Sequence, residues 1–70
     1  MSATVVASLR TRTTFISATE LAALLNVTRM SVHLWAKDGT LPHYRVNTRL
    51  RFDPAEVADW LERRRVGNAA

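Results

Sequence analysis

The sequence predicts one small, mainly α-helical domain, with three helices and a β-hairpin between the second and the third. Its 70 residues leave room for a single domain with a compact core. A side-chain capping signal precedes each of three apolar runs at helical spacing. Between the second and third runs, apolar residues instead occupy alternate positions, which is typical of paired strands with one buried face.

We expect the folded domain to occupy residues 15–65. Residues 1–14 are rich in Ser, Thr, Ala and Val without a sustained period, which predicts a flexible N-terminal arm, and residues 66–70 should form a frayed tail. No apolar run approaches the ~20 residues that span a bilayer. Apolar residues 1–9 lack the basic leader of a secretory signal, so we expect a cytoplasmic protein with no membrane partner.

The first helix should span residues 18–25. Ser17 and Glu20 form a capping box before an apolar run at helical spacing. The residues of that run are Leu21, Leu24 and Leu25. Phe15 and Ile16 lie just before the cap, where they can form a hydrophobic staple or a short strand.

The second helix should span residues 29–37 and end before Gly39. Asn26 tolerates the left-handed conformation that ends many helices, and Thr28 is the next N-cap candidate. Two helices joined by a turn of about three residues form a helix-turn-helix. Helical spacing then places three residues of the second helix toward the core, namely Val32, Trp35 and Ala36.

The hairpin should follow Pro42, because apolar and basic residues alternate there. The apolar positions are Tyr44, Val46, Leu50 and Phe52, and the basic positions are Arg45, Arg49 and Arg51. A three-residue loop over 47–49 pairs Val46 with Leu50, Tyr44 with Phe52 and Arg45 with Arg51, which leaves one face apolar. A two-residue loop would pair Val46 with Arg49 and mix the faces, which argues against it.

The third helix should begin after Asp53, with Pro54 in its first turn and Glu56 three residues beyond the cap. Its apolar stripe is Val57, Trp60 and Leu61, and Gly67 should mark its end. The order of helix, turn, helix, basic hairpin and helix is that of a small winged helix-turn-helix.

Charge is unevenly distributed along the chain. The net charge is +4, yet residues 43–52 carry three arginines and no acid, whereas residues 53–62 carry four acids and no basic residue. A local basic excess in so small a chain favours an anionic partner, whether a nucleic acid, an acidic protein or an anionic membrane.

Three segments span most of residues 15–61, namely ISATELAALLNVT, SVHLWAKDGTLP and RLRFDPAEVADWL. With these segments, the stretch 15–61 resembles the MerR-like DNA-binding domain in its excisionase branch. The resemblance implies double-stranded DNA as partner, with the second helix in the major groove and the hairpin wing on the backbone or minor groove. Excisionases bend DNA at a row of adjacent sites and bias a tyrosine integrase toward excision of a phage or integrative element. The absence of an effector domain favours this role.

We expect the recognition helix to contact DNA through Thr28, Arg29, Met30, His33 and Lys37, and the wing through Arg45, Arg49 and Arg51. Candidate flanking contacts are Arg10, Arg12, Arg63, Arg64 and Arg65, although an idle tail and favourable charge at a helix end are the alternatives. Met30 and Leu34 depart from the family pattern, in which these positions are often basic or polar. They suit thymine methyl groups or a neighbouring protein.

Two rival functions use the same features. One is a small MerR-like transcriptional repressor, and the other is a protein-interaction module in which Met30 and Leu34 dock an integrase-like partner. We predict no catalytic residue, cofactor, metal site or small-molecule substrate. His33 and His43 lack metal-ligand spacing, the chain has no cysteine, and its two glycines form no phosphate loop. One copy should bind DNA weakly, so we expect several copies side by side.

Overall fold

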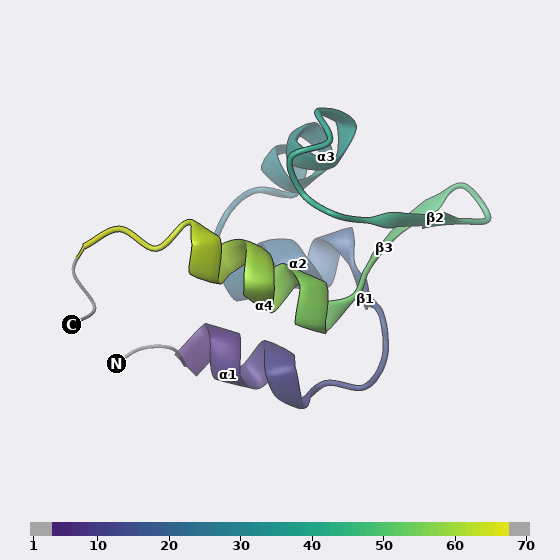
Figure 1. Cartoon of the computed structure of the whole chain (residues 1–70). Coiled ribbons are helices and arrows are strands. Elements are labelled where there is room, and N and C mark those ends of the chain that lie inside the picture. The colour runs from purple at the N-terminus through teal and green to yellow at the C-terminus, as the bar shows by residue number, and fades with distance from the viewer. Residues whose placement is uncertain (1–3, 68–70) are drawn as a thin grey trace.

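A computed structural model describes residues 4–67, which form four helices and a three-stranded antiparallel sheet (Figure 1). The elements in chain order are α1 (Thr4–Thr11), β1 (Ile16–Ser17), α2 (Ala18–Leu25), α3 (Arg29–Lys37), β2 (Tyr44–Val46), β3 (Arg49–Phe52) and α4 (Pro54–Arg63). The predicted fold class, a mainly α domain with a helix-turn-helix and a β-hairpin wing, is confirmed. It carries one more helix and one more strand than expected.

Helices α2 and α3 lie where their capping residues predict them. The side-chain oxygen of Ser17 accepts a hydrogen bond from the backbone N–H of Glu20, and that of Thr28 accepts one from Ser31, each at 3.1 Å. Asn26 adopts the left-handed conformation, with φ of 58°, and ends α2. Local sequence therefore determines the bounds of both helices of the helix-turn-helix.

Helix α4 begins as predicted but ends earlier. Asp53 caps it by accepting a hydrogen bond from the backbone N–H of Ala55 at 2.9 Å. The helix ends at Arg63, four residues before Gly67. Val66 lies beyond the helix, and residues 68–70 of the expected frayed tail lie outside the described residues.

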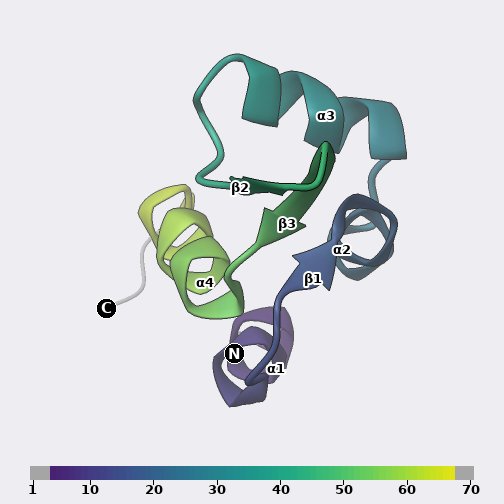
Figure 2. The same ribbon diagram turned by 90° about the vertical axis from the view of Figure 1, so that its right-hand side faces the viewer.

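Residues 4–11 form helix α1 in place of the expected flexible arm; residues 1–3 of that arm lie outside the described part of the chain. Helix α1 lies along α4 (Figure 2), and its Leu9 is fully buried. The sequence gives a weak helical signal here, because Val5 and Val6 are poor helix formers and the apolar stripe is short. Burial of Leu9 against the rest of the domain stabilises this helix.

Strand β3 is the central strand of the sheet. It pairs antiparallel with β1, with Ile16 opposite Phe52 and Ser17 opposite Arg51. Of the two roles open to Ile16, the structure shows the short strand. Ile16 and Phe52 are both buried, so this pairing sets which face of β3 turns toward the core.

The hairpin loop has two residues, so the predicted three-residue loop is wrong. Asn47 and Thr48 have φ of 51° and 66°, the left-handed conformations that a two-residue hairpin turn requires. The resulting pairs are Tyr44 with Arg51, Arg45 with Leu50 and Val46 with Arg49. The predicted register depended on burying one face of β2, but all three β2 residues are exposed. Because no β2 residue is buried, the observed register removes no apolar side chain of β2 from the core.

The core is continuous from α1 to α3 through the sheet. Its largest fully buried side chains are Phe52, Leu9, Ile16, Leu21, Leu41, Val32 and Val57. At its edge the Trp35 and Trp60 rings lie 5.6 Å apart, and the indole N–H of Trp60 donates to the Thr40 carbonyl at 2.8 Å. These contacts fix α3 relative to α4 and thereby position the exposed side of α3.

Candidate nucleic-acid interface

A groove of about 1010 Å³ lies between α3 and the wing, which is the β2–β3 hairpin. We call it the basic groove. Five Lys or Arg side chains line it, namely Arg29, Lys37, Arg45, Arg49 and Arg51, and no Asp or Glu is among its lining residues within 4–67. Helix α3 and the wing, which are consecutive elements of the chain, thus supply positive charge to one concave surface.

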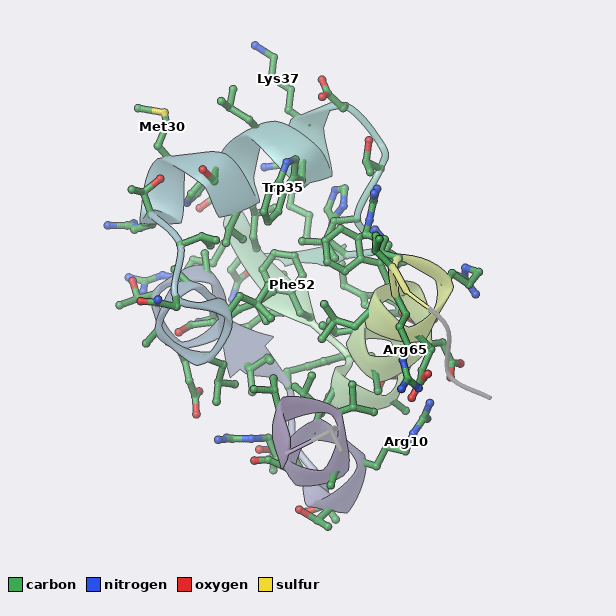
Figure 3. All side chains as sticks on the ribbon, turned by 90° about the vertical axis from the view of Figure 1, so that its left-hand side faces the viewer. Arg10, Met30, Trp35, Lys37, Phe52 and Arg65 are labelled. Atoms are coloured by element: carbon green, nitrogen blue, oxygen red, sulfur yellow. The ribbon has the colours of Figure 1, made fainter. Side chains whose placement is uncertain are left out.

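Helix α3 has a buried face and an exposed face, as its sequence spacing predicts. Val32 and Ala36 are buried, and Trp35 is half-buried against Trp60. On the other side Met30 is 67% exposed and Leu34 is 51% exposed. Figure 3 shows Met30 and Lys37 projecting away from the body of the domain, whereas Trp35 points into it.

The side of α3 that borders the wing is basic. Arg29, His33 and Lys37 follow one another at intervals of four residues, so they lie on one side of the helix. All three are exposed and line the basic groove. Thr28 instead caps the helix, and its hydroxyl lies 3.0 Å from that of Ser31. Thr28 and Met30 are not among the groove's lining residues.

The wing arginines reach the groove from both faces of the hairpin. Because Arg45 pairs with Leu50 and Tyr44 with Arg51, Arg45 lies on the opposite sheet face from Arg51. The predicted shared face of Arg45 and Arg51 is therefore wrong, yet both residues and Arg49 line the groove. Arg51 is half-buried and donates to the Leu50 carbonyl at 2.8 Å.

The wing contacts α4 and Phe15, the residue before β1, through Tyr44. The Tyr44 hydroxyl donates to Glu56 Oε2 at 3.4 Å, and the Tyr44 and Phe15 rings lie 5.3 Å apart. The negative charge of Glu56, with smaller contributions from burial and Asp53, raises the pKa of Tyr44 above its ordinary value. Tyr44 is therefore a neutral donor near pH 7, and it connects the wing to α4.

The structure does not bring the candidate flanking arginines to the basic groove. Arg10 and Arg12 form ion pairs with Asp59 at 3.0 Å and Glu20 at 2.6 Å. Helix α1 lies on the opposite side of the domain from α3 in all three views (Figures 1 to 3). The Arg64 guanidinium lies 4.4 Å from the Trp60 ring centroid. Arg63 and Arg65 are exposed outside the groove.

Sequence reasoning missed several groove residues. Thr19 at the start of α2, His43 before β2 and Thr48 in the hairpin turn all line it. His43 Nδ1 lies 3.0 Å from the Leu41 carbonyl oxygen, which can only accept, so Nδ1 carries the proton of that hydrogen bond. No periodicity links these three residues, because folding alone brings their segments together.

The described residues form neither a membrane span nor a metal site. No helix in 4–67 combines the length and the apolar character needed to cross a membrane. The same residues contain no group of three or more His, Cys, Asp or Glu side chains placed to hold a metal ion. The basic groove is thus a charged surface without an assembled metal centre in this part of the chain.

Comparison with known proteins adds the family. A family model described as a helix-turn-helix domain matches residues 15–65. The chain belongs to this helix-turn-helix family. Membership implies sequence-specific DNA binding, and such domains are typically not enzymes. No curated protein and no solved structure matches the chain significantly. Helix α1 precedes the span that matches the helix-turn-helix family.

Proposed function

We propose that the chain is a DNA-bending protein of excisionase type, which biases a tyrosine integrase toward excision of a phage or integrative element. Helix α3 enters the major groove of duplex DNA, and the wing contacts the adjacent backbone. One observation carries the DNA-binding geometry: α3 and the wing present five cations to a single groove, with no carboxylate among its described lining residues.

The basic groove suits a phosphate backbone that passes between α3 and the wing. Arg29 and Lys37 approach it from the helix, and Arg45, Arg49 and Arg51 approach it from the hairpin. Each cation that neutralises a phosphate releases a counterion, and the logarithm of the affinity falls with the logarithm of salt by about 0.9 for each such contact. Five contacts give a salt slope of about −4.5.

The excisionase role is supported by the resemblance of residues 15–61 to that branch and by the modest number of charges in one copy. About five phosphate contacts give weak binding at physiological salt. We propose that several copies bind adjacent sites and that the row of copies bends the DNA. A repressor on the same fold would act with few copies at one site.

Binding to duplexes of increasing length separates these functions. We would follow fluorescence anisotropy in a salt titration, count copies at saturation and measure bending by energy transfer between the duplex ends. Copy number, affinity and bend that all increase with duplex length support the excisionase role. Saturation at one or two copies without a bend supports the repressor instead, and no binding at low salt contradicts DNA binding. Arg51→Ala should weaken binding to every duplex, and Arg65→Ala, which is exposed outside the basic groove, is its matched control.

A further inference from the structure

Helix α3 presents two different stripes on its exposed side. Arg29, His33 and Lys37 form the basic stripe that borders the groove. Met30 and Leu34 form an apolar stripe beside it, one turn apart, with exposed fractions of 67% and 51%. Figure 3 shows Met30 at the outer surface of α3, away from the body of the domain.

The apolar stripe is not an extension of the core. The core side of α3 is occupied by Val32 and Ala36, which are buried, whereas more than half of the surface of Met30 and of Leu34 is exposed. In the proposed binding mode, with the basic stripe against a phosphate backbone, the apolar stripe faces the interior of the major groove. The apolar group that base pairs present there is the C5-methyl of thymine.

We propose that Met30 and Leu34 contact thymine methyl groups and so select sites with closely spaced thymines. This inference rests on the proposed DNA binding. The two residues are about 6 Å apart along the helix axis, since an α-helix rises 1.5 Å per residue. That distance is close to two base-pair steps of about 3.4 Å each, so the preferred thymines are two steps apart, with one base pair between them.

Charge complementarity favours DNA over an apolar protein surface as the occupant. Leu34 lines the same groove as five cations, and Met30 lies between Arg29 and Ser31 in sequence. A protein that covered the apolar stripe would also remove water from Arg29 and Lys37, which is unfavourable without paired acids. DNA supplies phosphates for those cations and methyl groups for the apolar stripe together.

Replacing thymine by uracil tests the inference, because the two bases differ only by the methyl group. Sites would first be selected from a random duplex pool with the unmodified chain and then resynthesised with deoxyuridine in place of thymidine. The unmodified chain should bind the uracil form about fourfold more weakly for each methyl contacted, or about 15-fold for two, from the free energy of burying a methylene-sized group. Selected sites should be enriched in pairs of closely spaced thymines.

The double variant Met30→Ala, Leu34→Ala should bind the thymine and uracil forms equally. Both side chains are exposed, so the variant should unfold at the same temperature as the unmodified chain by circular dichroism. Val66→Ala is the matched control, because Val66 is apolar and 94% exposed but lies beyond α4. It should retain the full difference between the two forms.

Three results would overturn the inference. The unmodified chain could bind both forms equally, the double variant could keep the difference, or the double variant could lose self-association in sedimentation while its preference for thymine stays unchanged. In each case salt-sensitive binding would persist, and the proposed function would stand. If the unmodified chain showed no salt-sensitive binding to any duplex, that result would instead contradict the proposed function itself.

Discussion

Arginines at the two ends of the domain have different surroundings. At the α1 end, Arg10 and Arg12 form ion pairs with Asp59 and Glu20. At the α3 end, the arginines of the basic groove have no carboxylate among the groove's described lining residues. The residue type is the same at both ends, so its role depends on the acids that folding brings nearby. We propose that the α1 end serves the fold and that the α3 end retains its charge for DNA.

Leu9→Ala has the largest expected effect. It removes a core contact of the α1 end and leaves the basic groove unchanged. Leu9 is fully buried, and truncating a buried leucine leaves a cavity, so the free energy of unfolding should fall by about 2–5 kcal/mol. Urea denaturation followed by circular dichroism measures this change. DNA affinity, measured where the variant is still folded, should be unchanged. A loss below about 1 kcal/mol would show that α1 is not an integral part of the domain.

The double variant Arg49→Ala, Arg51→Ala removes two positive charges from the basic groove and leaves the α1 end unchanged. Hydrogen bonds to charged groups contribute about 1.5–3 kcal/mol each, so removing two should weaken duplex binding about 100-fold or more. The free energy of unfolding should change by less than about 1 kcal/mol, because Arg49 is exposed and Arg51 is half-buried. Anisotropy and urea denaturation on the same samples separate the two effects. A large loss of stability with unchanged affinity would reverse the roles of the two ends.

Arg10→Ala tests the α1 ion pair and should have a small effect. The side chains of Arg10 and Asp59 are 45% and 59% exposed, and exposed ion pairs contribute about 0–1 kcal/mol. A double-mutant cycle with Asp59→Asn measures their coupling. DNA affinity should match that of the unmodified chain, whereas a tenfold loss would place Arg10 in the DNA interface after all.

Tyr44 gives the smallest expected effect and tests the contact between the wing and α4. Its pKa in the folded chain is raised, chiefly by Glu56, above the value of about 10 of an unfolded chain. Because the pKa is raised, the neutral Tyr44 hydroxyl contributes to folding stability below pH ~10. This contribution is lost as pH rises through the pKa of Tyr44 in the folded chain. Ultraviolet titration of the phenol should show that Glu56→Gln lowers the pKa of Tyr44. An unchanged pKa would mean that Glu56 does not act on Tyr44.

Local signals predicted the helix-turn-helix well. Ser17, Asn26 and Thr28 act through hydrogen bonds and backbone conformations within a few residues, so the bounds of α2 and α3 follow from the sequence. The exposed residues of α3 also follow from helical spacing, which is why Arg29 and Lys37 were expected in the interface. These features depend on no distant part of the chain.

Features that depend on tertiary contacts were not predicted. Helix α1 is stabilised by burial of Leu9, which its own sequence does not signal. The predicted hairpin register was wrong because no β2 residue is buried and β3 takes its orientation from pairing with β1. His43 and Thr19 line the basic groove because separate segments meet there, which no pattern in one segment reveals.

The salt dependence of duplex binding tests the difference between the two ends most directly. The unmodified chain should show a slope of about −4.5 for the logarithm of affinity against the logarithm of salt. Arg49→Ala with Arg51→Ala should reduce the magnitude of the slope by about 0.9 per residue, to about −2.7, and Arg10→Ala should leave it at about −4.5. Two results would contradict the assignment of DNA binding to the basic groove: an unchanged slope in the wing variant, or a reduction of the slope by Arg10→Ala as large as that by the wing variant.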